Sequence, residues 1–426
     1  MNVADSRRLT TSLEKLGYQQ TRVLAEADLI ILNTCVVRQS AENKAIGRLS
    51  SLRPLKLNNP GLTINLMGCL IGVHGNEAIQ KRFPWVDVFS PPSDPAPLLE
   101  FLKARMEKSD KDSWRARIDD ILDEEFVLPA ENQSMSISEN MPIVLGCSHA
   151  CVYCVIPYKR GREISRPLDQ IIQETNAFVA HGAREIVLLG QIVDRYGLDI
   201  PGSPHLDELL GELSKITDLK RLRFLTSHPN WMTGKLIDAV ASLPKVMPHI
   251  EVPIQAGDDG ILLAMRRGYT SDDYRLLIQK LRDRIPNVSI GTDIIVGFPG
   301  ESDKAFNNTK RLLADLKMDV AHLARYSPRP HTYSSRFLED DVPDQEKMRR
   351  FRELEELQEQ ISTEINARSL GQITSVLFED KSKERWRGRN PNNKLVFVET
   401  QQDLLGQERD VRITWTGPWS MLGELS

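Results

Sequence analysis

The sequence has few cysteines, no long apolar run and no excess of positive charge, and each absence excludes a class of protein. Five cysteines among 426 residues are too few, and odd in number, for a disulfide framework, so reduced thiols are available to a metal. No run of about 18 apolar residues is present, which excludes a predicted membrane span. The first residues, MNVADSRRLT, lack the apolar core of a signal peptide, and we expect a cytoplasmic protein.

The charge balance argues against a protein that is basic all over its surface. The formal net charge is −4, with 27% charged and 40% hydrophobic residues, as in ordinary soluble domains. A local basic patch remains compatible with this balance, because a phosphate field is felt over only about 10 Å at moderate salt. The length suffices for two or three domains of roughly 100–200 residues each.

The first hundred residues are predicted to form an open α/β sheet domain, residues 1–103. Two short apolar runs, 27–35 and 62–69, are typical of buried strands, and they end at Cys35 and Cys69. Ligand sites in open α/β sheets gather at the carboxyl ends of strands, so these two cysteines are candidate metal or cofactor ligands. The alternative is that both are ordinary core residues, because cysteine is often buried.

Three further segments follow. Residues 104–136 mix both charges densely and are predicted to be a linker with a solvated face. Residues 137–366 repeat a β-α pattern typical of parallel strands with helical crossovers, which predicts an incomplete six-stranded barrel that ends in a long amphipathic helix at 344–370. Residues 367–426 are predicted to form a small antiparallel β-barrel. The six strand candidates are 142–145, 185–190, 221–226, 249–254, 289–296 and 320–326.

The stretch GCSHACVYC, residues 146–154, places Cys147, Cys151 and Cys154 in one loop after the first predicted strand. Three thiolates in one loop suit one face of a 4Fe-4S cluster and leave its fourth iron open. The alternative is a zinc site with His149 as fourth ligand, but His149 lies between the cysteines and is poorly placed. Tyr153 puts an aromatic ring at the edge of the predicted cluster.

The Cys-x3-Cys-x-aromatic-Cys motif resembles that of the radical S-adenosylmethionine (SAM) superfamily, and other motifs narrow the resemblance to methylthiotransferases of the MiaB type. The resemblance implies that SAM binds the open iron and is cleaved to a carbon radical, which attacks an adenine carbon that acid–base chemistry cannot reach. It also implies a C-terminal RNA-binding module called TRAM. The matching stretches are MNVADS (1–6), LNTCVVRQSAENKAIGRL (32–49), MGC (67–69), RGREISRP (160–167), LLGQIVDRYG (188–197), RFLTSHP (223–229), AMRRGYT (264–270), TDIIVGFPGE (292–301), YSPRP (326–330), NKLVFVE (393–399) and GPWSMLGEL (417–425).

The resemblance further implies that Cys35 and Cys69 help to hold a second, auxiliary 4Fe-4S cluster. The family uses three N-terminal cysteines, of which the first directly precedes the Met-Asn at which this chain begins. Two interpretations follow: the natural protein begins upstream, which we favour, or the auxiliary cluster and the sulfur step are impaired.

The resemblance implies that several polar residues after the barrel strands contact SAM. Gln191, in LLGQ, corresponds to the stretch that meets the amino group of SAM. Together with Tyr153, the predicted cofactor contacts are Glu251, Gln255 and Arg266.

The stretch 381–394 holds six basic residues against Glu384 alone, which by charge count is more typical of a solvated face than of a binding surface. The resemblance to TRAM implies instead that this stretch binds RNA, with Trp386 as a candidate for stacking on a base. The predicted RNA contacts are Lys381, Lys383, Arg385, Trp386, Arg387, Arg389 and Lys394. A second basic stretch, 157–166, follows the cysteine loop, where a tRNA anticodon loop has to enter. For this stretch the charge count alone favours a solvated face that aids solubility.

The resemblance therefore implies a tRNA methylthiotransferase that modifies C2 of N6-isopentenyladenosine beside the anticodon, at position 37. Its expected partners are the tRNA anticodon loop and a reducing protein such as flavodoxin or ferredoxin, with no membrane and a monomeric state. Two alternatives remain: a non-enzymatic or impaired tRNA-binding homologue, and an enzyme that acts on threonylcarbamoyladenosine in tRNA or on a ribosomal protein.

Overall fold

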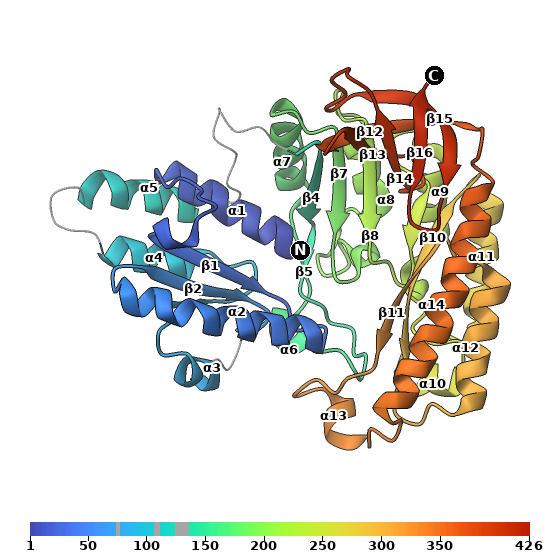
Figure 1. Ribbon diagram of the computed structural model, residues 1–426, viewed down its shortest axis with the longest axis horizontal. Coiled ribbons are helices and arrows are strands. Elements are labelled where there is room, and N and C mark those ends of the chain that lie inside the picture. Colours follow the sequence, from blue (N-terminus) through green and yellow to red (C-terminus); the bar gives the residue numbers. More distant parts are fainter. Residues whose placement is uncertain (74–76, 106–110, 124–135) are drawn as a thin grey trace. The chain divides into compact units, whose positions relative to one another are not determined.

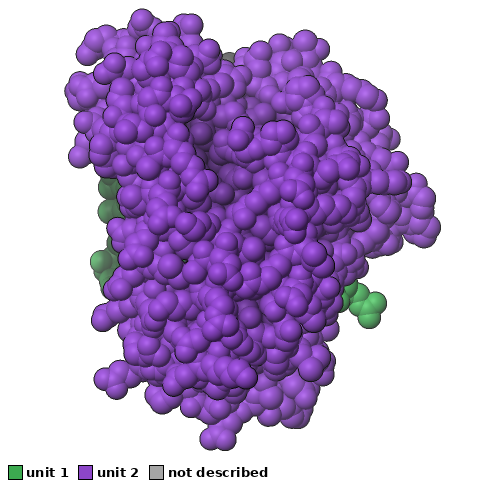
Figure 2. Space-filling view, turned by 90° about the vertical axis from the view of Figure 1, so that its right-hand side faces the viewer, with its two compact units in different colours: residues 1–133, 145–149, 154–164 green, residues 134–144, 150–153, 165–426 purple. Residues whose placement is uncertain are grey.

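The computed structural model describes residues 1–73, 77–105, 111–123 and 136–426, which fall into two compact units (Figure 1). The first unit comprises residues within 1–133 together with 145–149 and 154–164, and the second comprises the remainder (Figure 2). The loop with three cysteines is therefore divided, since Cys147 and Cys154 belong to the first unit and Cys151 to the second. Along the described segments, no helix is both long and apolar enough to cross a membrane.

The first unit is built on a parallel sheet of three strands, in the order β1 (Leu29–Thr34), β2 (Thr63–Gly68) and β3 (Val88–Ser90). The central strand β2 is buried at every position. β1 is an edge strand, and most of its residues are only half-buried. The prediction of two strands that end at Cys35 and Cys69 is confirmed, although only the second strand is fully buried.

Helices of the first unit include one in the segment that was predicted to be a linker. In α5 (Lys111–Asp123), Ile118 and Ile121 are buried and pack against Leu16 and Leu99. That part of the charged segment is thus packed onto the sheet domain, while 106–110 and 124–135 lie outside the described residues. The other helices of this unit are α1 (Asn2–Lys15), α2 (Gln39–Asn58), α3 (Glu77–Arg82), α4 (Ala96–Arg105) and α6 (Ile156–Arg160).

The second unit contains two parallel three-stranded sheets that adjoin, so that six strands follow one another in the predicted order (Figure 1). Backbone pairing of Leu222 with Val246 joins the two sheets. This arrangement confirms the incomplete barrel. The strands are β4 (Ser138–Pro142), β7 (Glu185–Leu189), β8 (Arg221–Leu225), β9 (His249–Glu251), β10 (Ser289–Val296) and β11 (Val320–Arg325).

The first barrel strand lies earlier in the chain than predicted. β4 is polar, with Glu139 buried, and it pairs with β7, while the apolar residues expected to form the strand pass into β5 (Val144–Leu145). β5 pairs instead with β6 (Ile164–Ser165), and this small sheet brackets the cysteine loop. The run of apolar residues indicated the wrong segment because the true strand, β4, contains a buried carboxylate, Glu139.

Helices connect the barrel strands, and the last of them, α14 (Asp344–Ala367), buries a more polar face than its apolar stripe predicts. Arg350 pairs with the buried Glu301 at 2.8 Å, and Gln358 donates to the carbonyl of Met318. The other helices of this unit are α7 (Leu168–Ala180), α8 (Leu206–Ser214), α9 (Gly234–Ser242), α10 (Asp259–Ala264), α11 (Ser271–Arg284), α12 (Asp303–Leu316) and α13 (Tyr333–Phe337). Short 3-10 helices lie at Val193–Arg195 and Pro229–Trp231 in this unit and at Leu24–Glu26 in the first unit.

The C-terminal strands close into a small barrel in which one pair, β14 with β16, is parallel and the other pairs are antiparallel. Arg223 of β8 fixes this barrel to β7 and β8, because its guanidinium pairs with Glu185 at 2.8 Å and donates to the carbonyls of Asn390 and Pro391. The five strands are β12 (Ile373–Ser382), β13 (Arg385–Arg389), β14 (Leu395–Glu399), β15 (Glu408–Thr416) and β16 (Met421–Leu425).

Candidate functional site

Cys35 and Cys69 lie at the carboxyl edge of the first sheet. Each directly follows its strand, and the last residues of these strands, Thr34 and Gly68, are in register. The Cys69 amide donates to the Thr34 carbonyl at 3.0 Å, which ties the two strand ends together. Gly68 has φ +99°, and a Cβ there would lie 2.5 Å from Asn33 Oδ1, so this close approach requires glycine. The structure therefore brings these two predicted ligands to one edge.

A buried arginine stands beside Cys69. Arg160 of α6 pairs with Asp5 at 3.4 Å and donates to Asn2 Oδ1 at 2.8 Å. Burial raises the pKa of Cys69, and the Arg160 charge opposes that increase. Arg160 thus belongs to the surroundings of the cysteine pair.

The basic stretch 157–166 is for the most part engaged inside the protein, which corrects its predicted role at the RNA entrance. Besides Arg160, Lys159 donates to the Leu70 carbonyl, and Arg166 pairs with Glu174 at 2.6 Å. Of the four basic side chains in this stretch, only Arg162 is exposed. Basic residues in a short stretch look alike in sequence whether they face solvent or a carboxylate.

The cysteine loop begins at Gly146, whose conformation only glycine adopts readily. Its φ is +67°, and a Cβ there would lie 2.0 Å from the Arg162 carbonyl oxygen. Cys147 follows, and its amide donates to the Gly161 carbonyl at 3.1 Å. Over the described ranges, no three His, Cys, Asp or Glu side chains are grouped as metal ligands. The ligand set thus stays a prediction from spacing, and its chemistry, thiolate sulfur alone, fits an iron–sulfur cluster.

Changing Gly146 to Ala is expected to reduce cluster loading severalfold, because the added methyl group collides with the Arg162 carbonyl and displaces Cys147. Iron per chain after anaerobic reconstitution measures this effect. Gly202→Ala is the matched control, since Gly202 has φ +74° with nothing within 4 Å of the added Cβ. The control is expected to lose about 1–2 kcal/mol from the left-handed backbone but no iron. Equal iron in both variants would contradict this account of the loop.

Cys151, in the second unit, accepts a hydrogen bond from Arg267, whose Nη1 lies 3.2 Å from the cysteine sulfur. The next residue, Val152, donates its amide to the Met265 carbonyl at 3.3 Å. Tyr153 packs edge-on against Phe298 with ring centroids 6.4 Å apart. The part of the loop with Cys151 is therefore held by the segment that follows α10, and the sequence analysis did not identify Arg267.

The predicted SAM contacts lie at different places. Gln191 follows the end of β7 and is half-buried, and Gln255 has φ +76° and pairs its backbone with Ile294 beside β10. Arg266 is exposed, and its guanidinium lies 4.6 Å from the centroid of the Tyr333 ring. Arg266 and Arg267 are adjacent in sequence, but only Arg267 points to a cysteine.

Glu251 lies near the amino end of its sheet, between two histidines. Its carboxylate is 3.6 Å from His249 Nε2 and 3.8 Å from His322 Nε2. Desolvation alone would raise the pKa of Glu251, but the proximity of His249 and His322 outweighs it and holds the pKa at about 2.

Glu251→Gln is expected to flatten the acid end of the stability profile. Because the pKa of Glu251 is lower in the folded protein than in the unfolded chain, its stabilisation is fully present above about pH 4.5 and is lost as pH falls toward 2. The shift corresponds to about 3 kcal/mol. Urea unfolding at pH 6 and pH 3 measures this loss of stability, which should be smaller in the variant. Identical losses in both proteins would show that the ionised Glu251 carboxylate does not stabilise the fold.

The stretch 381–394 covers the end of β12, all of β13 and the turn before β14, and one of its predicted RNA contacts is buried. Trp386 is 8% exposed and packs inside the C-terminal barrel, so it presents no open face to a base. Lys394 pairs with Asp319 at 2.9 Å with little exposure. Arg387 pairs with Asp380, and Arg389 donates to the Asn393 carbonyl.

The exposed basic side chains of this stretch are Lys381, Lys383 and Arg385. Two tryptophans that the sequence analysis passed over, Trp415 and Trp419, are about half exposed on the same barrel. Two signals could have identified them: the alternation of inward and outward side chains along β15 for Trp415, and the position of Trp419 in the turn before β16.

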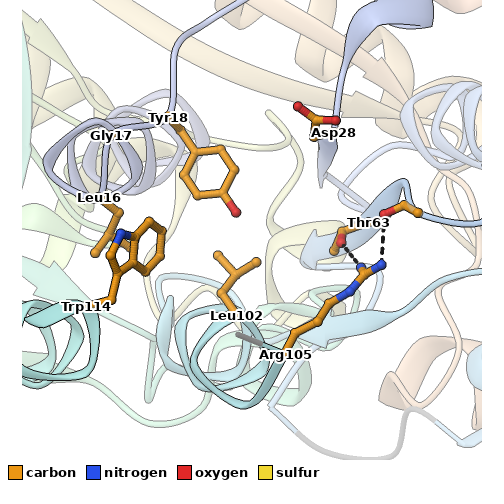
Figure 3. A pocket seen from close by; sticks show the side chains of 9 residues that line it. Leu16, Gly17, Tyr18, Asp28, Thr63, Leu102, Arg105 and Trp114 are labelled. Atoms are coloured by element: carbon orange, nitrogen blue, oxygen red, sulfur yellow. Dashed lines mark hydrogen bonds between the residues drawn. The ribbon is translucent and has the colours of Figure 1, made fainter. Parts of the chain in front are cut away.

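A cavity of about 380 Å³ in the first unit lies away from the cysteines. Tyr18, Trp114 and Arg105 line it, and Arg105 donates to the Thr63 hydroxyl at 2.6 Å (Figure 3). Thr63 begins β2, so the cavity is at the amino ends of the strands, opposite the edge that carries Cys69. No predicted site residue lines it.

Comparison with known proteins identifies the three parts of the chain. Residues 141–313 match the Radical SAM superfamily, residues 1–90 match the Uncharacterized protein family UPF0004, and residues 367–426 match the TRAM domain. Among solved structures, the chain is similar to the radical S-adenosylmethionine methyltransferase TsrM from Kitasatospora setae, with 14% identity, a TM-score of 0.52, and coverage of 86% of this chain and 70% of that one. This similarity shows the fold alone.

Closer relatives cover the whole chain, and all those compared carry the name tRNA-2-methylthio-N(6)-dimethylallyladenosine synthase. The protein from Roseiflexus sp. is 47% identical over 100% of this chain and 87% of its own length. The proteins from Dehalococcoides mccartyi and Chloroflexus aurantiacus are each 44% identical, over 100% and 99% of this chain and 96% and 89% of their own lengths. The chain therefore belongs to the MiaB-type family of radical SAM tRNA methylthiotransferases.

Proposed function

We propose that this protein adds a methylthio group to C2 of N6-isopentenyladenosine in tRNA, next to the anticodon. The observation that carries the proposal is the identity of more than 40% with tRNA-2-methylthio-N(6)-dimethylallyladenosine synthases along the full chain. Because the matched relatives share one substrate in their names, a ribosomal protein or threonylcarbamoyladenosine substrate is not favoured.

Cys147, Cys151 and Cys154 hold a 4Fe-4S cluster in this proposal, and Cys35 and Cys69 contribute to a second one. When bound, the first cluster and SAM supply a carbon radical, which is what an unactivated adenine carbon requires. Two contacts support the loop: Arg267 donates a hydrogen bond to the Cys151 sulfur, and the ring of Tyr153 packs edge-on against Phe298. Gln191, Glu251, Gln255 and Arg266 remain proposed contacts of SAM, although Glu251 also has a structural role between its histidines.

The TRAM barrel is the proposed RNA-binding surface. Lys381, Lys383 and Arg385 meet phosphates, and the exposed Trp415 and Trp419 replace Trp386 as the stacking candidates. We further propose that the protein acts in the cytoplasm as a monomer that receives electrons from a flavodoxin or ferredoxin.

Mass spectrometry of tRNA nucleosides tests the proposed function. The gene is expressed in a bacterial strain whose own methylthiotransferase gene is deleted, so that N6-isopentenyladenosine accumulates. We expect this nucleoside to be converted to its 2-methylthio form. Unchanged N6-isopentenyladenosine, with the protein folded and loaded with iron, would contradict the proposal.

A further inference from the structure

Arg267 is a buried cation without a carboxylate. Arg267 is only 4% exposed. Its three side-chain nitrogens donate hydrogen bonds to the Cys151 sulfur, to the Tyr269 hydroxyl at 2.8 Å and to the Pro253 carbonyl at 3.1 Å. Within the described part of the chain, no Asp or Glu forms an ion pair with it.

Three other buried arginines of the same unit pair with carboxylates. Arg221 pairs with Glu408 at 2.6 Å, Arg223 with Glu185 at 2.8 Å, and Arg350 with Glu301 at 2.8 Å. A buried charge is costly unless an opposite charge compensates it. Arg267 therefore needs an anion, and of its three partners only the Cys151 sulfur is a ligand of the proposed anionic cluster.

The guanidinium is also held in a fixed position. The Arg267 amide donates to the Leu262 carbonyl at 3.0 Å, and the Tyr269 hydroxyl that accepts from Arg267 donates to the carbonyls of Pro253 and Ile254. The guanidinium also lies 5.4 Å from the centroid of the Tyr269 ring. A charge held in this way is preorganised rather than mobile.

We propose that Arg267 is a positioning residue that serves as the counter-cation of the cluster bound by Cys151 and raises its reduction potential. The inference rests on the proposed function, which supplies the cluster. A thiolate-bound cluster is anionic and becomes more negative by one charge when it accepts an electron. A buried cation favours the reduced form, and a hydrogen bond to a ligand sulfur acts in the same direction.

A redox titration tests the role of Arg267. The full-length protein is reconstituted with iron and sulfide in a Cys35→Ala/Cys69→Ala background, so that only the cluster of the three-cysteine loop is observed. Dithionite is the reductant, and the electron paramagnetic resonance signal of the reduced cluster is followed. Arg267→Met removes the charge and the hydrogen bond, Arg267→Lys retains the charge, and Arg275→Gln is the control, because Arg275 pairs with Asp315 on the surface.

In Arg267→Met, we expect the ratio of reduced to oxidised cluster at a fixed potential to fall at least tenfold, which is about 59 mV for one electron. Arg267→Lys should recover most of this loss, and Arg275→Gln should match the parent. A second result would also support the role of Arg267 as counter-cation: the Arg267→Lys protein binds iron, whereas a folded Arg267→Met protein does not.

Three results would overturn the inference. They are an unchanged potential in Arg267→Met, an equal fall in the Met and Lys variants, and failure of both folded variants to bind iron. Failure of the parent protein itself to bind a cluster would instead contradict the proposed function, so the two failures are distinguishable.

Discussion

Replacing Cys147, Cys151 or Cys154 by Ala is expected to reduce both SAM cleavage and tRNA methylthiolation to background. Three thiolates are the minimum that holds a four-iron cluster with one iron open to SAM, so losing any one ligand removes the radical source. Formation of 5′-deoxyadenosine by the reconstituted protein measures the first effect, and tRNA nucleoside analysis measures the second.

The matched variants are Cys35→Ala and Cys69→Ala, which alter the other pair of cysteines. If these two serve the sulfur step, the variants keep SAM cleavage but lose methylthiolation. A Cys151→Ala protein that still cleaves SAM would show that the loop does not hold the catalytic cluster.

Glu185→Leu is expected to lower the free energy of unfolding of the second unit by about 3–5 kcal/mol, because it leaves the Arg223 guanidinium buried and uncompensated. Both members of this pair are 2% exposed. The same guanidinium donates to the carbonyls of Asn390 and Pro391, so the change should also loosen the C-terminal barrel. Urea denaturation followed by tryptophan fluorescence measures the loss.

Two controls accompany this prediction. Asp238→Ala breaks the exposed pair of Asp238 with Arg284, and we expect a cost below about 1 kcal/mol. The double variant Glu185→Leu/Arg223→Met removes both charges and should recover much of the loss. If Glu185→Leu lowers the free energy of unfolding no more than Asp238→Ala does, the Glu185–Arg223 pair does not stabilise the barrel as a buried ion pair.

The sequence predicted the order of the barrel strands and the strand ends that carry Cys35 and Cys69, because short apolar runs separated by helical stretches indicate buried strands of a parallel sheet. It failed at β4, since the buried Glu139 breaks the apolar pattern there. It also passed over β13, because its alternating Arg, Trp and Gly residues look like a solvated basic segment.

Side-chain roles were harder to predict than strands, for a physical reason. Whether an arginine faces solvent, a carboxylate or a sulfur depends on residues far away in sequence. Arg160 meets Asp5, and Arg267 rather than Arg266 meets Cys151. Trp386 was expected on the surface because of its basic neighbours, but strand alternation turns it into the barrel.

The most direct test of the methylthiotransferase assignment is the reaction of the reconstituted protein with tRNA that carries N6-isopentenyladenosine, using SAM labelled in its methyl group. Our account predicts two products: labelled 2-methylthio-N6-isopentenyladenosine in the tRNA and free 5′-deoxyadenosine. The Cys154→Ala protein is predicted to form neither. Cleavage of SAM with no label in that nucleoside would contradict it.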